Sequence, residues 1–346
     1  MTVRFPRLGG LAAGLAATAL ALSACGGAGS AASDGDRVRV VASTNVWGSV
    51  AQAVGGDAVE VKSIVSDPAT DPHSYESTPA DAAEISKARL VVFNGGGYDR
   101  FVEKILASSG GDRRTVEAVK AAQHDHADHK DQPSTAPTSA APTSAADGHG
   151  HDDHGSDKPE ASASGGGHHH DHGANEHVWY DLHAVSHVAD EVAKQLGELK
   201  ADKKDQFTRN AQQFKDRLST LDARVDGIAK AHQGVKVLAT EPIAHYLLEQ
   251  AKLTDVTPKA FVEAVEEEND PPAVAVAEVE RLLASREPKV LVHNPQTESP
   301  VTRQVREKAT AAGLGVVEMT ETLPQGKDYL SWMDEQVGNL EAALKR

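Results

Sequence analysis

Histidines gather in one stretch of the chain, residues 123–173, where they form three clusters interleaved with aspartate. Ten of the 17 histidines in this 346-residue sequence fall there. Neutral imidazole is the commonest ligand for zinc and copper-group ions, so the stretch has the composition of a metal reservoir. A purification tag would stand at a terminus and would not alternate with aspartate. The ten candidate accessory ligands are His124, His126, His129, His149, His151, His154, His168, His169, His170 and His172.

The same stretch has almost no residues that could form a hydrophobic core. Apart from histidine and aspartate it consists mostly of glycine, serine, alanine and proline. Such a composition cannot bury enough apolar surface to offset the entropy of ordering the chain. We therefore expect residues 123–173 to be a flexible insert within a folded protein.

The N-terminus has the pattern of a secretory signal. Arg4 and Arg7 precede an uncharged apolar run over residues 8–22, and small residues follow it. The run is too short for a membrane-spanning helix. Its end, Leu22-Ser23-Ala24-Cys25, resembles the lipobox of bacterial lipoproteins, in which the cysteine is lipidated and becomes the mature N-terminus. The prediction is a signal peptide at 1–24, lipid on Cys25 and a flexible tether over 25–36.

Cys25 is the only cysteine in the chain. Its isolation excludes intrachain disulfides and cysteine-based zinc sites. No second run of 18 or more apolar residues follows, so the lipid would be the only anchor. We expect the protein to be extracytoplasmic and held at the cell membrane through Cys25.

The net charge of −16 limits the classes of partner that the protein is expected to bind. A strongly acidic chain argues against nucleic acid or acidic lipid and favours cations, although solubility alone explains such a charge equally well.

Strand and helix patterns alternate in both halves of the chain outside the histidine-rich insert. Roughly 270 residues remain there, enough for two lobes of ordinary domain size. The alternation predicts an α/β protein with parallel sheets covered by helices. The expected strands cover residues 37–42, 59–65, 90–93, 235–239, 290–292 and 315–317.

One long amphipathic helix is expected to separate the two halves. Apolar residues recur at alternating spacings of four and three over residues 202–232, without an interrupting proline. This spacing gives one apolar stripe along the helix. The stripe consists of Phe207, Ala211, Phe214, Leu218, Leu221, Val225 and Ile228. The predicted fold is two (β/α) sandwich lobes, 37–201 and 233–346, joined by a rigid helix at 202–232.

Potential metal ligands stand near the ends of the expected strands or the start of a helix. His73, His177 and Glu241 do so, and His293 and Glu298 follow the strand at 290–292. Ligands of open α/β sheets bind at the carboxyl ends of strands. These donors therefore predict a metal site in a cleft between the lobes.

Two motifs make a family resemblance specific. They are Asp71-Pro72-His73-Ser74-Tyr75-Glu76, followed by Pro79 and Asp81, and Glu176-His177-Val178-Trp179. With a histidine-rich insert between them, they resemble the zinc/manganese solute-binding proteins of ABC importers, the TroA/ZnuA-like group also called cluster A-I. The resemblance extends over essentially all of residues 37–346.

The resemblance implies an ion held between two lobes by four side chains. By motif, His73 is the first ligand and His177 the second. The third follows the first strand of the second lobe, where this chain has Glu241 and resembles manganese-type members; His245 could instead turn inward.

The resemblance places the fourth ligand, an aspartate, in the loop after the strand at 290–292. This loop contains no aspartate, and Thr297 falls closest to the expected position. Glu298 is the expected substitute, with His293 or water as alternatives.

The expected function is capture of zinc and its delivery to the permease of an ABC metal importer. Two imidazoles with one or two carboxylates suit tetrahedral zinc but tolerate manganese, and the ten histidines of the insert favour zinc. The alternatives are a manganese-binding importer component, or a surface metal-buffering or adhesion lipoprotein without a transporter. We expect a monomer that undergoes a small tilt or a local loop rearrangement on loading, without wide hinge closure.

An enzyme is not expected. A secreted zinc hydrolase would have a general base beside its metal ligands. His183 and His187 are four residues apart, but Ala184 stands where that base would be.

Overall fold

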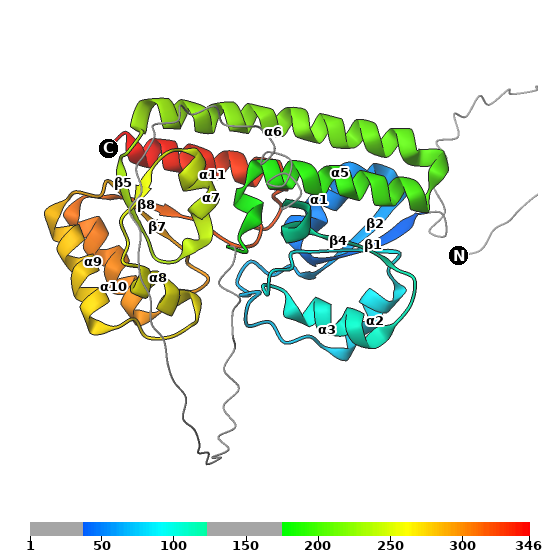
Figure 1. Ribbon diagram of the computed structural model, residues 1–346, viewed down its shortest axis with the longest axis horizontal. Coiled ribbons are helices and arrows are strands. Elements are labelled where there is room, and N and C mark those ends of the chain that lie inside the picture. The colour runs from blue at the N-terminus through cyan, green and yellow to red at the C-terminus, as the bar shows by residue number, and fades with distance from the viewer. Residues whose placement is uncertain (1–36, 123–174) are drawn as a thin grey trace, which may run out of the picture.

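The computed structural model describes residues 37–122 and 175–346 (Figure 1). The expected signal peptide, the tether with Cys25 and the histidine-rich insert at 123–173 lie outside these residues. Among the helices that are described, none combines the length and the apolar character needed to cross a membrane.

The first lobe is a four-stranded parallel sheet with the strand order β2-β1-β3-β4. Its strands are β1 (Val38–Thr44), β2 (Val59–Val65), β3 (Leu90–Phe93) and β4 (Arg114–Glu117). Alternate residues of β1 point to opposite faces, so Val40 packs with one apolar cluster and Val41 with another. The first face is covered by α1 (Asn45–Gly55) and α5 (Leu182–Leu199), the second by α2 (Pro79–Lys87) and α3 (Arg100–Ser109).

The second lobe repeats this topology with the order β6-β5-β7-β8. Its strands are β5 (Lys236–Ala239), β6 (Thr254–Asp255), β7 (Val290–His293) and β8 (Gly315–Glu318). The helices on one face are α7 (His245–Gln250) and α11 (Tyr329–Leu344). Those on the other are α8 (Lys259–Glu266), α9 (Ala273–Ser285) and α10 (Pro300–Ala312). The two-lobed, parallel-sheet fold class is confirmed.

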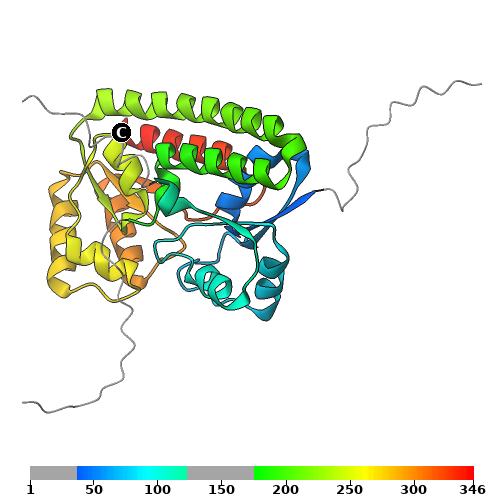
Figure 2. The same ribbon diagram turned by 45° about the vertical axis from the view of Figure 1, so that its right-hand side comes forward.

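A single helix, α6 (Lys204–His232), runs along both lobes (Figures 1 and 2). All seven residues of its expected apolar stripe are buried. The helix packs on α1 and α5 of the first lobe and on α7 and α11 of the second. Their buried side chains belong to one continuous hydrophobic cluster. Because close-packed cores resist deformation, this shared core limits how far the lobes can move relative to each other.

Short 3-10 helices connect several of these elements. They are η1 (Gly56–Ala58), η3 (Val178–Tyr180), η4 (Ala201–Lys203) and η5 (Pro242–Ala244). Two of them matter for the site, because His177 immediately precedes η3 and Glu241 immediately precedes η5.

Candidate metal centre

Hydrogen bonds within the first motif fix the loop that presents His73, between β2 and α2. Asp71 accepts a bond from the backbone N–H of His73 (2.8 Å) and another from the hydroxyl of Ser74 (3.0 Å). The hydroxyl of Tyr75 donates to Asp81 at 2.9 Å, beside the capping box that begins α2. The motif is therefore a scaffold that places one imidazole at the edge of the first sheet.

His177 is fully buried, and its ring is oriented by one neighbour. The Oδ1 atom of Asn175 lies 2.8 Å from both the backbone nitrogen and the Nδ1 atom of His177. An amide oxygen can only accept, so Nδ1 carries the proton and Nε2 keeps its lone pair. Burial, aided by His73, lowers the pKa of His177 well below 6.5. The ring is thus held neutral, the form that binds metals.

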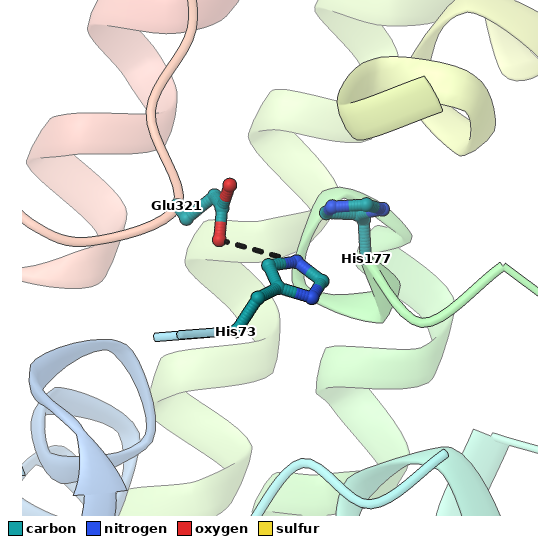
Figure 3. A group of neighbouring side chains, drawn as sticks. All are labelled: His73, His177 and Glu321. Atoms are coloured by element: carbon teal, nitrogen blue, oxygen red, sulfur yellow. Dashed lines mark ion pairs between the residues drawn. The ribbon is translucent and has the colours of Figure 1, made fainter. Parts of the chain in front are cut away.

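His73, His177 and Glu321 converge from three separate segments (Figure 3). Glu321 lies in the loop after β8, is 1% exposed, and has its Oε2 atom 3.5 Å from Nε2 of His73. Glu266, the last residue of α8, approaches the same point. Its Oε1 atom is 3.8 Å from Nε2 of His177 and 4.0 Å from Nε2 of His73. A second group, which is less buried, consists of His73, Glu176 and Glu266.

Two of the atoms that converge lack a hydrogen-bond partner. Nε2 of His177 and Oε1 of Glu266 are buried without a hydrogen bond, whereas Glu321 has the buried hydroxyl of Tyr98 as a neighbour. Leaving such an atom unpaired costs about 1–3 kcal/mol, so two of them facing each other need an explanation. Four ligands placed 2.0–2.2 Å from a tetrahedral zinc ion stand about 3.4 Å apart. The separations of 3.5–4.0 Å fit a divalent cation after a small contraction.

The carboxylates of the cleft also lack a compensating charge. Burial and the negative charge of Glu241 raise the pKa of Glu266 to about 10. Burial and Asp71 raise the pKa of Glu321 to about 8, and burial with Glu321 raises the pKa of Glu241 to about 8. A buried acid behaves in this way when its negative form is unpaired. A divalent cation at this point would supply the missing positive charge.

Glu241 lies beside the converging group and is linked to it by an amide. It is 1% exposed and accepts hydrogen bonds from Asn294 and from the hydroxyl of Thr297. The Nδ2 atom of Asn294 also donates to Oε1 of Glu321, at 2.8 Å. Glu241 and Glu321 therefore share one donor, although Glu241 belongs to neither close group of metal-binding atoms among the described residues.

The structure does not bring Glu298 to this group. Its carboxylate accepts from Arg303 (2.6 Å) and Arg306 (3.2 Å) and contacts Nε2 of His293 (3.2 Å). His245 is 54% exposed and lies 3.7 Å from Glu249, so it does not turn inward. A carboxylate held by two guanidinium groups is already neutralised, which makes it a poor candidate for an ion.

Sequence reasoning missed Glu321 and Glu266. The same rule that selected donors after strands could have found Glu321, since this residue follows the strand expected at 315–317. The sequence prediction instead placed the fourth ligand after β7, at Glu298. Glu266 ends a helix, and no local pattern marks it.

His183 and His187 lie on α5, outside the groups of metal-binding atoms found among the described residues. His183 is 68% exposed, with its Nε2 atom 4.0 Å from Asp222.

Two parallel-sheet lobes with imidazoles and carboxylates converging between them define a two-lobed protein with a candidate metal centre in its cleft. The family model described as ZnuA, zinc-uptake complex component A, periplasmic, matches residues 40–343. The chain belongs to this family. The expectation that it is not an enzyme is confirmed by that membership.

Curated relatives include metal-binding lipoproteins. The lipoprotein SsaB of Streptococcus sanguinis, a metal ABC transporter substrate-binding protein, is 25% identical over 58% of this chain and 54% of its own. MntA of Bacillus subtilis, a manganese-binding lipoprotein, is 26% identical over 62% of this chain and 58% of its own. This chain therefore spans less than two thirds of the length of either protein.

The similarity of fold covers more of the chain than these sequence matches do. The structure of TroA, a periplasmic zinc-binding protein of Treponema pallidum, superposes with a TM-score of 0.64 at 17% identity, covering 90% of this chain and 100% of that one.

Proposed function

We propose that this protein captures a zinc ion outside the cytoplasm and delivers it to the permease of an ABC metal importer. The observation that supports the proposal is the convergence of unpaired buried donors from both lobes. His73 and His177 come from the first lobe, whereas Glu321 and Glu266 come from the second. An ion held by both lobes is enclosed and can be presented as cargo.

In this proposal His73, His177 and Glu321 are the primary ligands. Glu241 and Glu266 are the two carboxylates that can complete the coordination shell. Glu241 would reach the ion by releasing Thr297, whereas Glu266 already faces both imidazoles. Glu321 takes the role expected of Glu298, whose carboxylate is occupied by arginines.

Zinc is proposed over other divalent ions because imidazoles provide two of the donors and the ten histidines of the insert favour it. Manganese is the second candidate. The observation in its favour is the number of buried carboxylates around the centre, since oxygen donors suit this harder ion.

The regions outside the described residues have proposed roles that rest on their sequence. Cys25 would be lipidated and would anchor the chain to the membrane. The histidine-rich insert would raise the local zinc concentration near the cleft. The protein would act as a monomer, and the core shared by the lobes supports a small movement on loading.

A chelator-competed titration with zinc and with manganese tests the proposal. The chain with residues 123–173 deleted should bind one tight equivalent of zinc, and His73→Ala should abolish it. The exposed His183→Ala is the matched control and should leave the equivalent in place. Failure of the deleted chain to bind would move the site to the insert and refute a cleft site.

A further inference from the structure

The amide of Gln296 lies at the junction of the two lobes. Gln296 is half-buried in the loop between β7 and α10 of the second lobe. Its Nε2 atom is 2.9 Å from the carbonyl oxygen of Pro68 and 3.2 Å from that of Thr70, both in the first lobe. The same nitrogen is 2.9 Å from the hydroxyl of Thr322, and the Oε1 atom accepts from the backbone N–H of Glu321 at 2.6 Å.

These contacts end on the two loops that present candidate ligands. Thr70 is three residues before His73, and Glu321 is itself in contact with the amide. The ligand atoms of His73 and Glu321 are 3.5 Å apart, close to the spacing that an ion requires. One side chain therefore sets the separation of two loops that belong to different lobes.

Both hydrogens of the amide are used. A glutamine NH2 group has two hydrogens, whereas three acceptors surround Nε2 here. Two of these acceptors belong to the first lobe and only the hydroxyl of Thr322 belongs to the second. Separation of the lobes would therefore leave one N–H without a protein acceptor, and this cost favours the arrangement in which the two loops stay together.

The other side of the Glu321 loop is bound differently. Asn45, at the start of α1, exchanges two hydrogen bonds with the backbone of Leu323, at 2.9 and 3.0 Å. Asn45 belongs to the helical layer that packs on the shared core, and its side-chain bonds do not reach the His73 loop. Among the side-chain hydrogen bonds of residues 37–122 and 175–346, those of the Gln296 amide alone join both ligand loops.

We propose that Gln296 is a positioning residue that couples the two ligand loops and keeps the cleft closed around its ion. Resting on the proposed function, this inference assigns Gln296 the control of how tightly the cleft holds its ion. With the amide in place, His73 and Glu321 are held at the spacing of a bound ion before the ion arrives. Such preorganisation lowers the entropic cost of binding and slows release.

Substitution of Gln296 by Met tests the coupling in the full-length protein. Methionine keeps the length of the side chain and removes every hydrogen bond. Residues that orient metal ligands contribute about 10- to 100-fold in affinity, so we expect a loss of that size in chelator-competed zinc binding. Most of the loss should come from faster release in stopped-flow measurements. Gln325→Met, an exposed position in the loop after β8, is the control and should bind as the wild type does.

Hydrogen exchange of the metal-free protein shows whether Gln296 holds the His73 loop of the other lobe or stabilises only its own loop. In Gln296→Met, amides of residues 66–73 should exchange faster although the substitution lies in the other lobe. If Gln296 only stabilised its own loop, exchange would change near residues 290–300 and 318–324 alone, and that result would overturn the inference. Gln296→Asn, which keeps the amide but is one methylene shorter, should give the same pattern and serves if the Met variant fails to fold.

His73→Ala distinguishes the two possible failures. If the wild type and His73→Ala bind zinc identically, the cleft holds no ion, and both the proposed function and the inference fall. If His73→Ala loses a tight equivalent while Gln296→Met keeps wild-type affinity and release rate, the inference alone is refuted.

Discussion

Replacement of Asn175 by Leu should weaken metal binding although this residue is not a proposed ligand. Asn175 accepts hydrogen bonds from both the backbone N–H and the Nδ1–H of His177. Leucine has a similar volume and accepts neither bond. The imidazole would then lose the partner that fixes its tautomer and aims Nε2 at the cleft.

The expected loss of zinc affinity in Asn175→Leu can be estimated from the two hydrogen bonds that His177 loses, each 2.8 Å long. A hydrogen bond of this kind contributes about 0.5–1.5 kcal/mol net, so the pair contributes about 1–3 kcal/mol. Since about 1.4 kcal/mol corresponds to tenfold in affinity, the expected loss is about 5- to 140-fold. This interval includes the range usually found for residues that orient a metal-bound histidine.

A chelator-competed zinc titration of the chain lacking residues 123–173 would measure this loss. Asn175→Asp is the matched variant, because a carboxylate still accepts from Nδ1 and makes the imidazole a stronger ligand. It loses only the bond that the amide donates to the carbonyl oxygen of Pro242, at 2.8 Å. Aspartate should therefore bind zinc within about threefold of the wild type. Equal affinity of the Leu variant and the wild type would refute the reasoning, as would equal weakening by Leu and Asp.

Three further predictions follow from the geometry. Binding should release about one proton at pH 7 and strengthen from pH 7 to pH 8, because the pKa of Glu321 is about 8 without an ion and this residue must lose its proton to bind one. Calorimetry in two buffers of different ionisation enthalpy measures this, and a release of zero protons would contradict it. Glu321→Gln should weaken zinc binding by more than about 100-fold, which is beyond the effect of residues that only orient ligands. Glu298→Gln should change zinc binding little, because its carboxylate is paired with arginine. If a titration gave the reverse order, Glu298 would be the ligand instead. Phe207→Ala should lower the free energy of unfolding by about 3–5 kcal/mol in urea denaturation, since this side chain on α6 is fully buried, and a loss below 1 kcal/mol would contradict the shared core.

Most of the fold could be predicted because its central strands and long helix have strong periodic patterns. The residues of β3, for example, are all buried and apolar, and the stripe of α6 keeps its spacing over the whole helix. The edge strands β4 and β6 were not predicted. Both residues of β6 are exposed, and β4 has a single buried residue, so neither has a hydrophobic pattern that distinguishes it from a loop.

The candidate site could be predicted only in part. His73 and His177 were found because each lies in a local motif whose hydrogen bonds form within a few residues. Glu241 was predicted because it follows a strand directly, and it lies beside the converging group without belonging to it. Glu266 could not be found, because it reaches the imidazoles only after the second lobe has folded against the first. Gln296 was missed because the same loop was searched for charged ligands, whereas its amide acts by joining two loops.

The most direct test of the central claim is an anomalous difference map at the zinc absorption edge, from crystals grown with one equivalent of zinc. We expect one peak in the cleft, about 2.0–2.2 Å from Nε2 of His73, Nε2 of His177 and a carboxylate oxygen of Glu321. A map with no peak between the lobes, or with its peak beside Glu298 and His293, would contradict it.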